Sequence, residues 1–212
     1  AKAYKPENKS IVSGQVLQCP YDFQKARLVV REMADALALD LVDKGLVTNQ
    51  MVLTVGYDRE NLDDPSRAAR YKGPVTVDRY GRKIPKHAVG TENFSYTSSA
   101  NDLLKAVTAL YDRIVDKNLL IRRLSISANR LLDETSVSKE EPAEQLDLFT
   151  DYTTKEKQEQ ADKAAHTRER KLQEAMLGIK KKYGKNAILK GMNLEDGATA
   201  RERNQTIGGH QA

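Results

Sequence analysis

The chain has 212 residues, of which 39% are hydrophobic and 31% charged, and its formal net charge is +5. The apolar share is below the ~45–50% of an average globular domain, so we expect one folded domain with solvated extensions. With a single cysteine, Cys19, the chain cannot form an internal disulfide or a thiolate zinc site. No apolar run approaches the ~18 residues of a membrane span. The basic charge balance favours a polyanionic partner.

The first part of the chain predicts a strand, a helix and a second strand. Residues 10–17 are strand-like, and residues 23–44 place apolar side chains at helical spacing. Asp22 is a typical start signal before this helix, and Gly45 is a typical stop signal after it. Residues 48–58 alternate between apolar and polar, which indicates a half-buried strand.

The middle of the chain predicts a loop, a small ribbon and a third strand. Residues 61–73 are polar and contain a proline, so we expect a loop there. Residues 75–84 resemble a short β-ribbon that turns at Gly81. Residues 87–95 follow as a strand.

A second helix and a fourth strand complete the predicted domain. Ser98 or Ser99 can cap a helix that ends at Asn118. Residues 120–131 then predict a strand with one apolar and one polar face. The apolar face carries Leu124, Ile126 and Ala128, and the polar face carries Arg123, Ser125, Ser127 and Asn129.

The order of elements predicts an α+β fold, a four-stranded sheet with two helices on one face (βαββαβ). The other face would stay open, and we expect function there. Beyond the domain, composition predicts a linker, a charged helix and a flexible tail with little apolar content. The expected division is 1–9 linker, 10–132 domain, 133–150 linker, 151–183 charged helix and 184–212 tail.

Basic residues concentrate between positions 70 and 130, where few acidic residues accompany them. Cations together with hydroxyl groups and backbone N–H groups are the set that contacts phosphates. We therefore expect a phosphate-binding sheet face, although a plain solvated face would have a similar composition. The polar face of the last strand has no aromatic residues, which argues against an RNA-recognition sheet.

Signatures of catalysis are missing from the sequence. It contains no phosphate-cradling GxxxxGK[ST], no HExxH and no GxSxG. The paired carboxylates Asp63 and Asp64 fall in the expected loop, where we interpret them as solvated. We therefore expect no enzyme activity, no metal and no small-molecule substrate.

Five segments of the chain carry a family resemblance: residues 9–15, 26–44, 90–93, 100–117 and 120–125. In this order they resemble the little-finger domain of Y-family (translesion) DNA polymerases. The similarity is to the UmuC/DinB-like (ImpB/MucB/SamB) branch of Gram-positive type, and it extends over residues 10–132. The tail segment 181–191 is also similar to the C-terminus of that branch.

The resemblance implies that the open sheet face lies along primer–template DNA and grips both backbones. It also implies that the catalytic domains, with their magnesium-binding carboxylates, are absent here, so that the parent protein would be the DNA polymerase. A cytoplasmic, nucleoid-associated location follows from that role. The positions implied to contact DNA are Ser10, Ser13, Gly14, Lys86, Gly90, Thr91, Asn93, Arg122, Arg123 and Ser125.

A short apolar island follows the domain and consists of Gln145, Leu146, Asp147, Leu148 and Phe149. It resembles the bacterial sliding-clamp-binding peptide. The resemblance implies recruitment of the clamp; the alternative is a linker segment that packs on its own domain. For the chain as a whole, the alternative is a non-catalytic regulatory module that binds protein partners.

Overall fold

The structure is a computed structural model that describes residues 9–137, 152–207 and 210–211. Its centre is an antiparallel sheet in the order β1-β6-β2-β5, and a short strand, β7, pairs with the start of β2 as a fifth member. The strands are β1 (Ile11–Tyr21), β2 (Leu46–Tyr57), β5 (Ala88–Thr97), β6 (Ile121–Asn129) and β7 (Leu132–Asp133).

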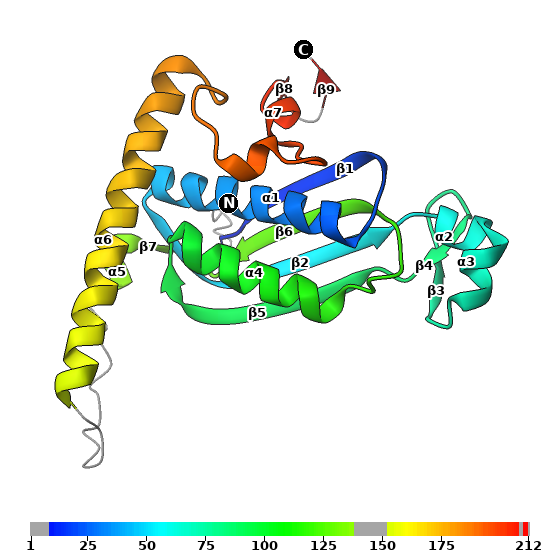
Figure 1. Cartoon of the computed structure of the whole chain (residues 1–212), viewed down its shortest axis with the longest axis horizontal. Coiled ribbons are helices and arrows are strands. Elements are labelled where there is room, and N and C mark those ends of the chain that lie inside the picture. Colours follow the sequence, from blue (N-terminus) through cyan, green and yellow to red (C-terminus); the bar gives the residue numbers. More distant parts are fainter. Residues whose placement is uncertain (1–8, 138–151, 208–209, 212) are drawn as a thin grey trace, which may run out of the picture.

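Two helices, α1 (Phe23–Lys44) and α4 (Ala100–Ile114), cover one face of this sheet (Figure 1). The expected α+β class is therefore confirmed. Helix α1 has the predicted ends: the Asp22 carboxylate accepts from the backbone N–H of Lys25 at 2.9 Å, and Gly45 adopts a φ of 63°. Ser99 caps α4, which ends at Ile114, earlier than the expected Asn118.

The core lies between the sheet and these two helices. It is almost entirely aliphatic, with Leu53 and Ile126 of the sheet fully buried. Tyr111 of α4 is its main aromatic member, and its hydroxyl donates to the carbonyl oxygen of Phe23 at 2.9 Å. A phenol buried in this way needs such a partner, and this hydrogen bond links the two helices directly.

Residues 58–87, which we call the inserted subdomain, lie beyond the ends of β2 and β5 (Figure 1). The expected loop is wrong at this point, because the Asp64 carboxylate accepts from the N–H groups of Ser66 and Arg67 and starts a helix with proline in its first turn. The predicted ribbon is present, and Gly81 has a φ of 78°. The elements of the inserted subdomain are α2 (Glu60–Asp63), α3 (Pro65–Arg70), β3 (Val75–Val77) and β4 (Lys83–Pro85).

The long charged helix α6 (Tyr152–Tyr183) crosses the end of the sheet layer (Figure 1). Polar contacts hold it: the Glu169 carboxylate accepts from the Ser99 hydroxyl at 2.8 Å and from the Asn101 N–H at 2.9 Å, at the start of α4. The short helix α5 (Glu134–Val137) adds an ion pair to Arg170. Of the apolar side chains in the second half of this helix, Met176 is buried whereas Leu172 is 58% exposed.

The tail is not the flexible segment that its composition predicted. From residue 184 to 205 it packs along α1 and includes the short helices η1 (Gly191–Leu194) and α7 (Ala200–Arg203); the small strands β8 (Thr206–Ile207) and β9 (His210–Gln211) follow. The buried Glu32 carboxylate of α1 accepts from the Asn193 side chain at 2.8 Å and from the Thr199 N–H at 2.7 Å. Buried polar contacts therefore hold the tail, together with the buried Met192 and Ala200.

Candidate nucleic-acid interface

The face of the sheet opposite the helices is defined by rows of paired residues. Pairing places the side chains of one row on the same side of the sheet. One row runs from β1 to β5 as Val12, Ser127, Val52 and Thr91. The neighbouring rows are Gly14–Ser125–Thr54–Val89, Val16–Arg123–Gly56 and Asn129–Gln50–Asn93.

These rows contain no carboxylate. We call them the open face. Its centre is polar, and three valines at its two sides, Val12, Val16 and Val89, are 61–65% exposed. Aspartate and glutamate are absent even though they are 30 of the 212 residues of the chain. An anionic ligand would therefore meet no repulsive side chain on the open face.

One row is ordered by a chain of side-chain hydrogen bonds. Gln50 donates to Asn93 Oδ1 at 2.8 Å, and Asn129 donates to Gln50 Oε1 at 3.3 Å. Ser127 donates to Asn129 Oδ1 at 2.6 Å. Because its oxygen is occupied, the Asn93 amide presents its N–H donors to solvent, which is the arrangement that a phosphate oxygen requires.

The two arginines at the start of β6 have different surroundings. Arg123 is exposed in its row on the open face, and a Cβ added to Gly56 would lie 3.1 Å from the Arg123 Cβ. Pairing is irregular just before it, so that Arg122 has no partner in β2. Arg122 instead lies 3.9 Å from the largely buried carboxylate of Asp58. Arg123 is therefore the arginine that is free to bind an anion.

The structure brings only part of the predicted DNA-contacting set together on the open face. Ser13 and Gly90 belong to the row Ser13–Ile126–Leu53–Gly90, whose central members are fully buried under the helices. A Cβ on Gly90 would lie 2.8 Å from Leu110 Cδ1, so this glycine permits α4 to approach the sheet. The residues that share the open face are Gly14, Thr91, Asn93, Arg123 and Ser125.

The remaining predicted residues lie outside the rows. Ser10 is exposed directly before β1, and Lys86 is exposed in the inserted subdomain just before β5. Residues 145–149, the expected clamp-binding peptide, fall outside the described residues. Gln50 and Thr54 of β2 also lie on the open face and are not among the predicted residues, although the alternation of that strand already places them opposite its buried face.

Within the described ranges, no group of histidine, cysteine, aspartate or glutamate side chains is arranged to hold a metal ion. No helix of this part of the chain is long and apolar enough to cross a membrane. Asp63 and Asp64, the paired carboxylates of the sequence, are engaged with Arg59 and with the start of α3 respectively.

Comparison with known proteins identifies the family. No curated protein sequence matches the chain. A solved structure titled "Complex of beta-clamp processivity factor and little finger domain of PolIV" is similar with a TM-score of 0.38 and 10% identity, covering 67% of this chain and 100% of the other. The model of the impB/mucB/samB family C-terminal domain matches residues 8–148. The chain therefore belongs to the impB/mucB/samB family, the Y-family polymerase group that its sequence resembles, through the C-terminal domain of that family.

Proposed function

We propose that this chain holds duplex DNA across its open face through contacts to the sugar–phosphate backbone, as the DNA-binding domain of a translesion polymerase. The contacts are independent of sequence, because the face is a sheet without a recognition helix that could enter a groove. Arg123 supplies charge, Asn93, Thr91 and Ser125 supply hydrogen bonds, and the valines offer apolar contact to the sugars.

The observation that carries this proposal is a solvated sheet face without a carboxylate in a chain that is rich in them. The acids next to this face are already neutralised: Glu92, whose neighbours in β5 point to the open face, turns to the helix side and pairs with Arg113 at 2.6 Å. Asp58, the first residue of the inserted subdomain, lies 3.9 Å from Arg122. The result is a weakly positive surface that suits a polyanion.

The test compares two arginines on opposite sides of the sheet layer. Arg123→Ala should weaken binding to duplexes of unrelated sequence alike, and should make the slope of log affinity against log salt less steep by about one unit. Arg27→Ala is the matched control, because Arg27 pairs with Asp112 between the two helices on the covered side of the sheet, and it should leave both quantities unchanged. Fluorescence anisotropy over a series of KCl concentrations measures both.

Binding that depends on sequence and ignores salt would contradict this proposal. Absence of duplex binding at physiological salt, combined with salt-insensitive association with a protein, would favour a regulatory module that binds protein partners. These outcomes separate the two functions with a single set of reagents.

We also propose that residues 145–149 bind a sliding clamp. Leu148 and Phe149 are the apolar pair that would enter a pocket on the clamp, and Gln145 is the polar anchor. The double variant Leu148→Ala/Phe149→Ala should abolish clamp binding in surface plasmon resonance and keep the duplex affinity of the parent chain. Unchanged clamp binding would contradict this assignment.

The polymerase reaction belongs, in this proposal, to the catalytic part of the parent protein, where magnesium would act. This domain would need no cofactor of its own and would work in the cytoplasm at the nucleoid. Duplex binding by this chain should accordingly persist in EDTA, which an anisotropy titration with and without the chelator would show.

A further inference from the structure

The inserted subdomain is a rigid extension of the sheet. The side chain of Asn61 is fully buried; it donates to the carbonyl oxygens of Asp58 and Leu120 at 2.8 Å each and accepts from the Leu120 N–H at 2.8 Å. Tyr71 packs against the core, and its hydroxyl donates to the Pro74 carbonyl oxygen at 2.8 Å. The hairpin of β3 and β4 therefore keeps a fixed position relative to the open face.

The charge of this subdomain is positive, and three of its five acids pair with arginines within it. Residues 58–87 include eight lysines and arginines against five aspartates and glutamates. Three aspartates pair with arginines of the same segment, Asp63 with Arg59, Asp64 with Arg67 and Asp78 with Arg82. Among the described residues, no carboxylate pairs with the remaining cations, Arg70, Lys72, Arg79, Lys83 and Lys86.

The tip of the hairpin presents an aromatic ring between two cations. Tyr80 is 64% exposed, and the guanidinium groups of Arg79 and Arg82 lie 4.7 and 4.9 Å from its ring centroid. Asp78 shapes the turn by accepting from the N–H groups of Tyr80 and Arg82 at 2.8 and 3.0 Å. The hydrogen bond from Arg82 holds the pKa of Asp78 below its ordinary value, so the carboxylate that shapes this turn keeps its charge to a lower pH than an ordinary aspartate.

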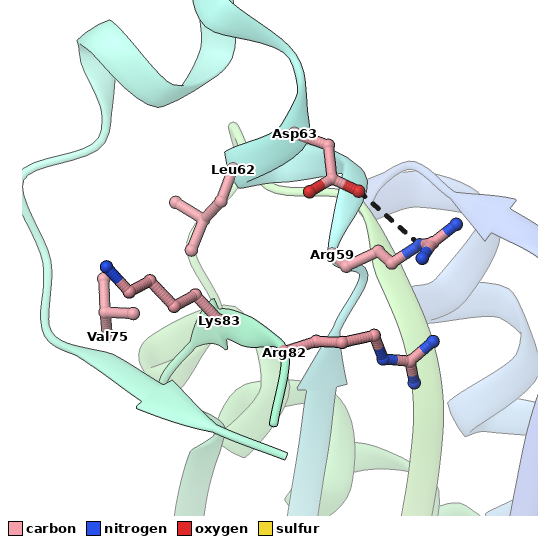
Figure 2. A pocket seen from close by; sticks show the side chains of 6 residues that line it. All are labelled: Arg59, Leu62, Asp63, Val75, Arg82 and Lys83. Atoms are coloured by element: carbon pink, nitrogen blue, oxygen red, sulfur yellow. Dashed lines mark ion pairs between the residues drawn. The ribbon is translucent and has the colours of Figure 1, made fainter. Parts of the chain in front are cut away.

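Next to the tip, a hollow of about 470 Å³ opens between α2 and the hairpin. Figure 2 shows Leu62 and Val75 on its walls, with Arg59 and Arg82 pointing toward the same side. Arg122, next to Arg123 in β6, lies 3.9 Å from the carboxylate of Asp58, the residue with which the inserted subdomain begins. Cations thus continue from the last row of the open face to the subdomain that carries the exposed ring.

We propose that the hairpin tip binds single-stranded DNA that leaves the duplex at this end of the sheet. An exposed aromatic ring with neighbouring arginines can stack on an unpaired base, and every base offers a π-face for such a contact. A paired duplex offers no free base faces, so the ring favours the single strand over the duplex backbone. This inference rests on the proposed function of the open face, since the duplex must lie there to deliver the strand.

The experiment uses the full chain with two labelled DNAs, a blunt duplex and the same duplex with a 5′ single-stranded overhang. The chain without substitutions should bind the overhang DNA more tightly than the blunt duplex. Arg79→Ala/Tyr80→Ala should remove that advantage, a loss of about fivefold or more at the scale of one stacked base, and should leave the blunt duplex affinity unchanged. Arg123→Ala should weaken both DNAs alike.

A matched control is available at the end of α6, where Lys182 lies 5.1 Å from the ring centroid of the exposed Tyr183. Lys182→Ala/Tyr183→Ala should leave both affinities as they are. Equal binding of the two DNAs by the parent chain would overturn the inference while the open-face function stands, and so would an equal loss on both DNAs in the tip variant. Failure of the parent chain to bind either DNA would instead overturn the proposed function.

Discussion

The two sides of the central sheet differ in how far their polar groups are satisfied by partners within the chain. On the open face, Asn93, Ser125 and Arg123 lie at the surface with hydrogen-bonding capacity left over. On the covered side, Glu32 and Asp35 of α1 are nearly buried, and the tail satisfies them with Asn193, the Thr199 N–H and Lys190. Polar residues that already have partners stabilise the fold, whereas those that lack them mark the surface available to a ligand.

The largest test of this contrast is Glu32→Ala. It leaves the Asn193 amide and the Thr199 N–H without their acceptor, so we expect the free energy of unfolding to fall by about 2–4 kcal/mol. Urea denaturation measures the loss, and limited trypsin digestion should cut residues 184–205 more readily. Asp196→Ala is the control, because its carboxylate is 88% exposed in the ion pair with Lys25, and its urea midpoint should not move. An unchanged midpoint for Glu32→Ala would show that the tail contributes little.

A smaller loss of stability is expected when alanine replaces one of two glycines of the sheet, Gly90 but not Gly14. Gly90→Ala places a Cβ 2.8 Å from Leu110 Cδ1 and 2.9 Å from Ile114 Cγ2, in a packed core. We expect a loss of about 1–3 kcal/mol in the free energy of unfolding, with duplex affinity retained. Gly14→Ala meets nothing closer than 3.9 Å and should unfold like the parent chain. A stable Gly90→Ala variant that has lost DNA affinity would place Gly90 functionally with the open face.

The smallest effect comes from Tyr111→Phe, which removes the hydroxyl bonded to the Phe23 carbonyl oxygen and should cost about 1 kcal/mol at neutral pH. Burial raises the pKa of Tyr111 above that of an ordinary phenol. The unfolded chain therefore loses this proton first, and the stability that it contributes is present below about pH 10 and falls as the pH rises toward the raised pKa. Thermal melts between pH 8 and 11 should show a flatter decline for Tyr111→Phe than for the parent chain. Parallel declines would contradict this origin.

Helix ends and strand faces could be predicted from the sequence, because they depend on residues that are neighbours in the chain. Asp22 and Gly45 set the ends of α1, and the apolar–polar alternation of β6 placed Arg123 and Ser125 on the open face. The α+β class followed from the same signals. The short helix α3 could also have been found, since an aspartate followed by proline is a standard helix start that the polar composition of the segment concealed.

Other features depend on contacts between distant parts of the chain. Glu32 meets Thr199 across 167 positions, so no window of sequence around residues 184–205 predicts that the tail is ordered. A glycine carries no side chain whose character reveals its side of the sheet, and only the row with Leu53 and Ile126 shows that Gly90 faces α4. Ser13 could have been assigned correctly, because it shares its parity with the buried Leu17.

The tail also bears on where this domain can be cut. The family match ends at residue 148, but the groups that neutralise Glu32 and Asp35 come from positions 190–200. A fragment limited to the matched residues 8–148 would expose Glu32 and Asp35 of α1 to water, because it would lack the tail that covers them. Such a fragment would carry two additional exposed carboxylates on the helix side, and its electrophoretic behaviour would differ from that of the whole chain for this reason alone.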